Sequence, residues 1–562
     1  MSPRQCDVVV VGAGFGGLYA LYELRALGLS VVVLEAGPDV GGTWFWNRYP
    51  GARCDVESVD YSYSFSPELE QEWRWTSRYA TQPEILSYLR HVAERFDLRR
   101  NIQFDTRVTE AHFDDGTFRW TVRTDTGDTI SSRFCVMATG CLSTAQVPDL
   151  PGKDSYRGNV YHTGTWPGPV GFEGQAVGVI GTGSSGIQVI PQVAAQAEHL
   201  YVFQRTPNFS TPANDQPLDP EIVREVKAGY AARRALAQDS PGALPLPRPT
   251  IAPDDVDADE RYAVMERAWE VGGNSMQVTF KNLLIDQATN DVVAEFMRSK
   301  IRQKVKDPAT AERLCPKDHP FGSKRVCKDT DYYETFNRPN VTLVDLRSEP
   351  IVALHQSGIA TTKADYQLNS LVFATGFDAM TGTLLKIDIL GRDGTRLVDE
   401  WDGGPQTYLG LMVAGFPNLF LVTGPGSPSV LTNMVAAIEQ HIRWIARCID
   451  DVDTRGYATI EARREAQVNW VTEANKVAEQ TLYTKANSWY IGANVVGKPK
   501  VFMPYVGGFD RYRRICEEVT ASGYRGFIRS PADADADASA LAHAAPGGRL
   551  PAGDDHGQRP NR

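Results

Sequence analysis

The stretch VVVVGAGFGG, residues 8–17, places the pattern G-x-G-x-x-G directly after an apolar run, and VGVIGTGSSG, residues 177–186, repeats the arrangement. In each, a short strand is expected to lead through the glycines into a helix. The first glycine permits a tight turn, the second lets the backbone approach a pyrophosphate, and the third lets helix pack on strand. The pyrophosphate then lies at the positive helix N-terminus. Two such motifs predict two dinucleotides and electron transfer between them.

The residue that follows the second strand of each unit indicates which dinucleotide binds. Ser30–Leu34 is expected as a strand that ends at Glu35, and an acid there accepts a hydrogen bond from a ribose 2′-OH, as FAD or NAD requires. Leu200–Phe203 instead leads to Gln204 and Arg205, and an arginine can bind the 2′-phosphate of NADP. We therefore predict FAD at the first motif and NADPH at the second. The alternative is that the second motif binds no nucleotide, but all of its glycines are intact, which disfavours this alternative.

This pattern predicts an α/β protein with two Rossmann-like dinucleotide-binding domains and a helical insertion. We expect an FAD domain over residues 1–145 and 385–530, a Pro- and Gly-rich linker over 146–176, an NADP domain over 177–210 and 321–384, and a charged, helical insertion over 211–320. Residues 531–562 are rich in Ala, Asp, Gly and Pro and are expected to form a disordered tail.

Local patterns add individual elements. Apolar residues recur at helical spacing over Glu84–Phe96, and a second helix is expected over Ser429–Asp450. Phe118–Arg123 and Thr129–Met137 are expected as paired strands. Strands near 341–344 and 371–373 should complete the second sheet. Turns made of small residues follow two strands, at Ala138-Thr139-Gly140 and Thr375-Gly376. Such turns would allow close contact with a nucleotide, although a tight turn without a functional role is the simpler interpretation.

Composition excludes several classes of function. The 562 residues carry a net charge of −11 and no dense basic run, so nucleic acid is not expected as a partner. No apolar run approaches the roughly 20 residues of a membrane helix, and the first strand begins too early for a signal peptide. The eight cysteines show neither C-x-x-C nor metal-ligand spacing. We expect reduced thiols, a cytoplasmic protein, no bound metal and no obligate protein partner.

Between the two glycine motifs, the segment Tyr156-x-Gly158-x-x-x-His162-x-x-x-Trp166-Pro167 resembles the F-x-G-x-x-x-H-x-x-x-W-P fingerprint of Baeyer–Villiger monooxygenases, with Tyr in place of the first Phe. Similar segments extend the resemblance over about residues 5–530, and within the family the chain resembles the phenylacetone and steroid monooxygenase branch. These further segments are Gly41–Asp55, Lys324-Arg325, Asp331–Glu334, Gly424–Leu431 and Ser488–Asn494.

The resemblance implies an enzyme whose substrates are a ketone and O2. In the family, NADPH reduces FAD, the reduced flavin forms a C4a-peroxyflavin with O2, and this species attacks the ketone to give an ester or lactone. The cofactors carry the difficult chemistry, while the protein positions the reactants and excludes water. The branch implies bulky cyclic, aryl or steroid-like ketones.

The resemblance also assigns roles to residues. Arg325 is expected to be the fixed cation beside the flavin, because a guanidinium stays charged and offers several donors, and Asp55 is expected to orient it. Lys324 would join Arg205 and Thr206 around the 2′-phosphate, and Trp489 would cap the nicotinamide nucleotide. His162 is expected to have a structural role, and Ser429–Asn433 should line the substrate pocket. The remaining expected cofactor contacts are Gly12, Gly14, Gly17, Thr43, Trp44, Asp55 and Val56 for FAD, and Gly181, Thr182, Gly183, Ser184, Ser185 and Gly186 for NADP.

Three other functions fit part of the sequence. A flavin monooxygenase that oxygenates nitrogen or sulfur would share both glycine motifs, but Trp166-Pro167 and Lys324-Arg325 favour ketone oxidation. A disulfide reductase needs a redox cysteine pair beside the flavin, and the chain has no C-x-x-C. A nucleotide-binding sensor without chemistry would not need Asp55, Arg325 and Trp489.

Overall fold

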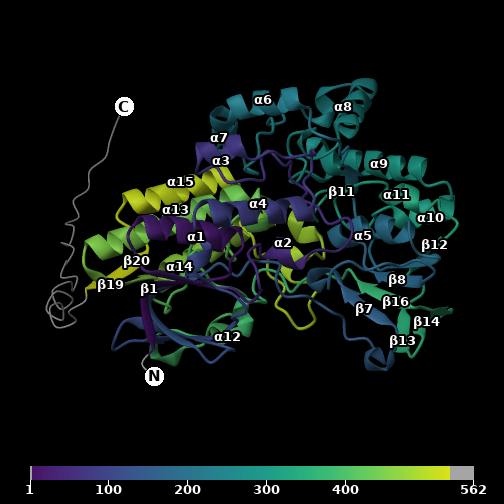
Figure 1. Cartoon of the computed structure of the whole chain (residues 1–562). Coiled ribbons are helices and arrows are strands. Elements are labelled where there is room, and N and C mark those ends of the chain that lie inside the picture. Colours follow the sequence, from purple (N-terminus) through teal and green to yellow (C-terminus); the bar gives the residue numbers. More distant parts are fainter. Residues whose placement is uncertain (1–2, 532–562) are drawn as a thin grey trace, which may run out of the picture.

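The computed structural model describes residues 3–531 and places the two glycine motifs in two separate sheets (Figure 1). Within these residues, no helix is both long and apolar enough to cross a membrane. The expected tail lies outside the described residues, apart from Pro531, which ends the last strand.

The first sheet has eight strands and contains the motif at residues 12–17. The strands β6, β1, β2 and β3 form its parallel part, which contains the glycine motif, and β4 and β5 continue from β6 as an antiparallel meander. Two strands from the distant C-terminal half, β17 and β18, pair with β4 and β6. The strands are β1 (Arg4–Val11), β2 (Val31–Leu34), β3 (Ile102–Gln103), β4 (Val108–Asp114), β5 (Arg119–Thr124), β6 (Thr129–Met137), β17 (Asp388–Leu390) and β18 (Leu419–Leu421).

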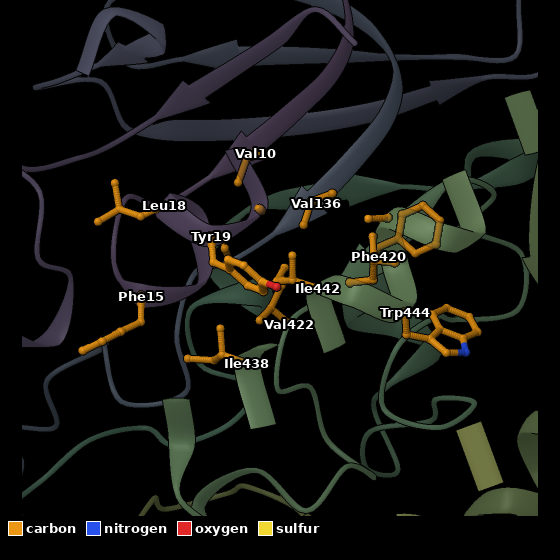
Figure 2. Close-up of a cluster of buried hydrophobic side chains, with 14 of the residues drawn as sticks. Val10, Phe15, Leu18, Tyr19, Val136, Phe420, Val422, Ile438, Ile442 and Trp444 are labelled. Carbon is orange, nitrogen blue, oxygen red and sulfur yellow. The ribbon is translucent and has the colours of Figure 1, made fainter. Parts of the chain in front are cut away.

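Helix α1 follows the first glycine turn and packs between this sheet and α13, where apolar side chains from all three meet (Figure 2). Each face of the sheet carries its own buried apolar cluster, because successive side chains of a strand point to opposite faces. The helices of this unit are α1 (Phe15–Ala26), α2 (Thr43–Trp46), α3 (Pro67–Glu72), α4 (Gln82–Arg95), α12 (Leu397–Glu400), α13 (Met434–Thr454), α14 (Arg464–Glu479) and α15 (Phe509–Ala521).

The second sheet is fully parallel, in the order β12-β9-β8-β16-β7, and α5 (Ser184–Ala194) and α11 (Tyr332–Thr335) pack on it. Its strands are β7 (Asn159–His162), β8 (Ala176–Ile180), β9 (His199–Gln204), β12 (Val341–Asp345) and β16 (Ser370–Phe373). Three short strands form a separate antiparallel sheet beside it: β13 (Ile351–His355), β14 (Gly358–Thr361) and β15 (Asp365–Gln367).

Helices dominate the segment between β9 and β12, and two of them, α8 and α9, pack around a separate apolar cluster. They are α6 (Pro220–Ala228), α7 (Tyr230–Gln238), α8 (Ala258–Val271), α9 (Gln287–Lys304) and α10 (Pro308–Leu314). The parallel strands β10 (Ser210–Pro212) and β11 (Cys327–Asp329) close this segment at its two ends. A last antiparallel pair, β19 (Tyr457–Ala462) and β20 (Phe527–Pro531), ends the described chain.

Two expectations from the sequence need correction. The segment at 146–176, expected as a linker, contributes β7, which pairs with β16 at the edge of the second sheet. The helix expected from Ser429 begins instead at Met434, because Ser429 has a φ of +43° and Asn433 caps the helix by accepting the backbone N–H of Val435. The helix at Glu84–Phe96, the paired strands β5 and β6, and the closing strands β12 and β16 are confirmed within a few residues.

Candidate active site

Both glycine turns have the geometry that a dinucleotide requires. Gly12 has a φ of +102° and Gly181 a φ of +110°, values that side-chain-bearing residues rarely adopt. A Cβ on Gly17 would lie 1.8 Å from the carbonyl oxygen of Gly12, and one on Gly186 would lie 2.2 Å from that of Gly181. The third glycine of each motif is therefore needed for helix α1 or α5 to pack against its own turn.

A cavity of about 900 Å³ opens from the first glycine turn and runs between the two units. Ala138, Thr139 and Gly140, the small-residue turn after β6, form part of its wall, which favours their use as a nucleotide contact. Of the residues expected to bind cofactor or act in catalysis, the cavity is lined by Gly12, Gly14, Glu35, Thr43, Trp44, Asp55, Val56, Ser184, Ser185, Arg325 and Trp489.

The other expected residues lie outside this cavity. Gly17 lies in the first turn of α1, behind the wall. Arg205 is exposed, whereas burial, with a smaller contribution from the charge of Arg205, lowers the pKa of Lys324. The residues of this group that belong to the second unit are Gly181, Thr182, Gly183, Gly186, Arg205, Thr206 and Lys324.

Glu35 is buried at the end of β2, with 4% of its surface exposed. Its two carboxylate oxygens accept backbone N–H groups, one from Ala13 at 2.6 Å and one from Gly37 at 2.8 Å. Burial raises the pKa of Glu35 above its ordinary value, against these two hydrogen bonds. The acid thus fixes the glycine turn and also borders the cavity.

Arg325 joins the second unit to the first. Its Nε donates to Asp55 Oδ2 at 3.2 Å, and its Nη1 donates to the carbonyl oxygen of Val430 at 3.1 Å. Burial alone would lower the pKa of Arg325, but the neighbouring Asp55 carboxylate raises it above its ordinary value, so the cation is permanent. The backbone oxygen of Arg325 accepts a hydrogen bond from Asn208 Nδ2 at 3.2 Å, which anchors it to the second unit.

One oxygen of Asp55 remains without a partner. Asp55 Oδ1 is buried and accepts no hydrogen bond within the described residues, although its other oxygen binds Arg325. A buried carboxylate oxygen normally has a donor. Together with the open cavity beside it, this unmet acceptor indicates that a bound molecule supplies a donor at this point.

The His162 side chain serves the local backbone. Its Nδ1 accepts the N–H of Gly164 at 2.9 Å, and burial lowers its pKa, which favours the neutral ring. Trp166 is buried in the core of the second unit, where Tyr161 and Phe172 pack on it. The fingerprint therefore shapes the edge of the second sheet, and Gly164 and Thr165 bring that edge to the cavity wall.

Several contacts were not found by sequence reasoning. Tyr49 donates to Gln188 Oε1 at 2.8 Å and joins the first unit to α5. Lys386 and Phe377 line the cavity. Lys328 is buried near Asp55 and Arg325, and its Nζ donates to Thr211 Oγ1 at 3.2 Å. Lys328 follows Arg325 by only three residues, but nothing in its sequence context signals burial.

The chain is similar to known proteins in sequence and in overall structure. The pyridine nucleotide-disulphide oxidoreductase family model matches residues 9–239, although all eight cysteines of this chain are free thiols. A Baeyer-Villiger monooxygenase of Pseudooceanicola batsensis is 42% identical over 93% of this chain and 96% of its own.

Two solved structures are similar over almost all of the described chain. An oxidised steroid monooxygenase bound to NADP is 55% identical, with 94% of this chain and 100% of that chain covered and a TM-score of 0.89. OTEMO, solved in complex with FAD and NADP, is 40% identical at the same coverage, 94% and 100%, with a TM-score of 0.91. The chain belongs to the Baeyer–Villiger monooxygenase family.

Proposed function

We propose that this chain binds FAD at the first glycine turn and NADPH at the second, and uses them with O2 to convert a ketone into an ester or lactone. The observation that carries the proposal is the position of Arg325. This residue of the second unit is held by Asp55 and Val430 of the first, on the wall of the cavity that both units share.

The residues present fit both nucleotides. The first and third glycines of each turn leave no room for a Cβ, Glu35 lies at the end of β2, and Asp55 offers an unmet acceptor beside the cavity. An added Cβ on Gly183 would meet no atom within 4 Å, so the N-terminus of α5 is open to a pyrophosphate. When bound, FAD supplies oxygen activation and NADPH supplies the hydride.

Arg325 supplies the electrostatic part of the reaction. When the carbonyl carbon of a ketone is attacked, its oxygen gains negative charge, and a fixed guanidinium nearby stabilises that charge. Asp55 holds the guanidinium in place through Nε, while Val430 fixes Nη1. Hydrogen bonds from two sides orient the cation before substrate arrives, so little reorganisation is needed during the reaction.

We further propose bulky cyclic, aryl or steroid-like ketones as the substrates. The cavity that Arg325 lines also has apolar side chains on its wall, among them Val430, Met434, Phe377 and Trp489. The similarity to a protein named steroid monooxygenase supports the same class. Because Val430 also accepts a hydrogen bond from Arg325, the loop before α13 links the shape of the pocket to the position of the cation.

The test is an incubation of FAD-loaded protein with NADPH, labelled O2 and a panel of linear, cyclic, aryl and steroid ketones, with one sulfide and one amine included. We expect esters or lactones that carry one labelled oxygen, formed fastest from bulky ketones. Arg325→Ala should retain FAD and lose ester formation by roughly 100-fold or more. Arg224→Ala, a matched change at an exposed arginine, should leave it unchanged. Oxygenation of only the sulfide or amine would contradict the proposal.

A further inference from the structure

A second cavity, of about 230 Å³, lies between α7, α13, α15 and the loop at residues 60–64. These helices lie together at one side of the first unit (Figure 1). Helix α13 separates the two cavities: Met434 and Ile438 line the large cavity, whereas Ala436, Gln440, Arg443 and Arg447 line the small one. The latter four recur at helical spacing and form one face of the helix.

The walls of the small cavity carry four arginines and three carboxylates, and the carboxylates are already engaged. Asp60 is paired with Arg233 at 2.6 Å, and Glu517 with Arg513 at 2.8 Å. Glu439 accepts hydrogen bonds from the backbone N–H of Ser64 at 2.7 Å and from its hydroxyl at 2.5 Å.

The arginines are not all engaged. The guanidinium of Arg234 donates hydrogen bonds to Glu70, to Ser62 and to the carbonyl oxygen of Asp60. Arg447, by contrast, has no carboxylate within 4.0 Å among residues 3–531, and it is exposed at the mouth of the cavity. Arg443 beside it donates through Nε to Tyr19 and lies 3.7 Å from Glu439 through Nη2. One guanidinium at the mouth of the cavity is therefore available to a ligand.

Most of the side-chain atoms that lack a hydrogen-bond partner on the walls of this cavity are donors. Trp444 is 5% exposed, and its Nε1–H has no acceptor in the described part of the chain. The Nε atom of Arg513 is also buried and has no acceptor there, although the side chain as a whole is 24% exposed. Gln440 Oε1 is the one unmet acceptor among the same lining side chains. Buried donors are normally satisfied, so two unmet donors beside an unpaired arginine call for an acceptor with negative charge.

We propose that this cavity is a binding site for a small organic carboxylate. Its carboxylate would lie against Arg447 and Arg443, and its apolar body would lie against Phe509 and Ala436. A volume of about 230 Å³ equals roughly eight water molecules at about 30 Å³ each, which suits a molecule of benzoate size.

The cavity lies directly behind the loop that shapes the candidate active site. Asn433 lines the small cavity, caps α13 and donates to the Asp60 carbonyl at 2.8 Å. Its neighbour Thr432 lines the large cavity, and Val430 accepts the hydrogen bond from Arg325. The small cavity is therefore separate from the candidate active site, and the loop before α13 contributes to both cavities.

The test is a titration of the FAD-loaded protein with benzoate, phenylacetate and hexanoate, followed by calorimetry and by the melting temperature, with benzamide as the neutral control. We expect one site for a carboxylate and none for benzamide. Arg447→Glu should weaken binding at least tenfold, because a charge-assisted contact is lost and a like charge gained. Ala436→Leu should block the site by filling it.

Arg325→Ala distinguishes the two cavities, because it removes the cation of the large one and should leave carboxylate binding unchanged. Arg224→Ala serves as the exposed-arginine control. The proposal is overturned if no carboxylate binds, if benzamide binds as tightly as benzoate, or if binding is lost in Arg325→Ala and retained in Arg447→Glu and Ala436→Leu. These outcomes do not depend on ketone oxidation, so they are separate from a failure of the proposed function.

Discussion

The two glycine turns share one backbone design but have different surroundings. At the first turn, Glu35 is buried, fixes the turn through the N–H of Ala13, and borders the large cavity. At the second, Arg205 is exposed and Gly183 faces open space. The same fold can thus hold one nucleotide inside the molecule and present another at an open face. We expect FAD to remain bound through turnover and NADP to exchange.

The largest effect should come from the third glycine of each motif. Gly17→Ala places a Cβ 1.8 Å from the Gly12 oxygen, and Gly186→Ala places one 2.2 Å from the Gly181 oxygen, so each turn must distort. We expect Gly17→Ala to abolish FAD retention, and Gly186→Ala to keep FAD while losing its reduction by NADPH. Bound flavin after gel filtration and flavin reduction measure these outcomes.

Gly183→Ala is the matched control for Gly186→Ala. Its Cβ meets no atom within 4 Å, and its φ of −83° suits any residue, so the fold should be unaffected. Only the approach of a pyrophosphate should suffer, which predicts a higher KM for NADPH. Loss of FAD in Gly186→Ala, with retention in Gly17→Ala, would reverse the assignment of the two sites.

The next effect concerns the contact between the two units. Asp55→Asn keeps the shape of the side chain and removes the charge that holds Arg325. We expect the rate of ester formation to fall about 10- to 100-fold, with FAD retained, because a charge-assisted hydrogen bond becomes an ordinary one. Product formation under saturating NADPH measures it. An unchanged rate would remove Asp55 from the positioning of the guanidinium.

A smaller effect is expected at the open nucleotide site. Arg205→Ala should raise the KM for NADPH about 10- to 100-fold and leave that for NADH nearly unchanged, because only NADPH carries the 2′-phosphate. Lys324→Ala should act in the same direction. Arg347→Ala, an exposed arginine of the same unit paired with Asp345, is the control. Equal losses for NADPH and NADH would contradict a phosphate contact.

The smallest effect is a pH-dependent change in stability at Lys328. Burial lowers the pKa of Lys328 to about 8, whereas a lysine of the unfolded chain titrates near 10.4. Between these values the unfolded chain binds more protons, so this group makes the folded state more stable as the pH rises. Below pH 8, Lys328 of the folded chain is a buried ammonium group, and its desolvation lowers the free energy of unfolding.

Lys328→Met removes this cost and should raise the melting temperature by a few degrees at pH 7. The advantage over the wild type should shrink as the pH rises through 8 toward 10. Thermal denaturation at pH 7 and 9.5 measures it, with the exposed Lys317→Met as control. A constant difference across this range would show that Lys328 does not titrate there.

Local chemistry explains what the sequence predicted well. Short stretches of sequence are enough to predict the glycine turns, the strands and helices, and the acid at Glu35, because each depends only on neighbouring residues. The strand β7 was missed because it is four residues long, stands among prolines and glycines, and exposes two of its side chains. The predicted start of α13 was too early because Ser429 has a positive φ, which the local sequence does not indicate.

Contacts between distant segments could not be derived in this way. Asp55 and Arg325 are 270 residues apart, and family resemblance, not spacing, brought them together in the sequence analysis. Lys328 is buried only because β10 and β11 pair across the helical segment. The arginine-lined cavity behind α13 likewise joins α7, α13 and α15, and no single stretch of sequence encodes it.

The central claim is that two different nucleotides meet in one chain and exchange electrons. Anaerobic mixing of the FAD-loaded protein with one equivalent of NADPH tests it most directly, with the flavin absorbance followed over time. We predict complete loss of the oxidised flavin spectrum in the wild type and a much slower loss in Arg205→Ala at the same NADPH concentration. A flavin that stays oxidised in the wild type, or is reduced equally fast by both proteins, would contradict the assignment of the second site.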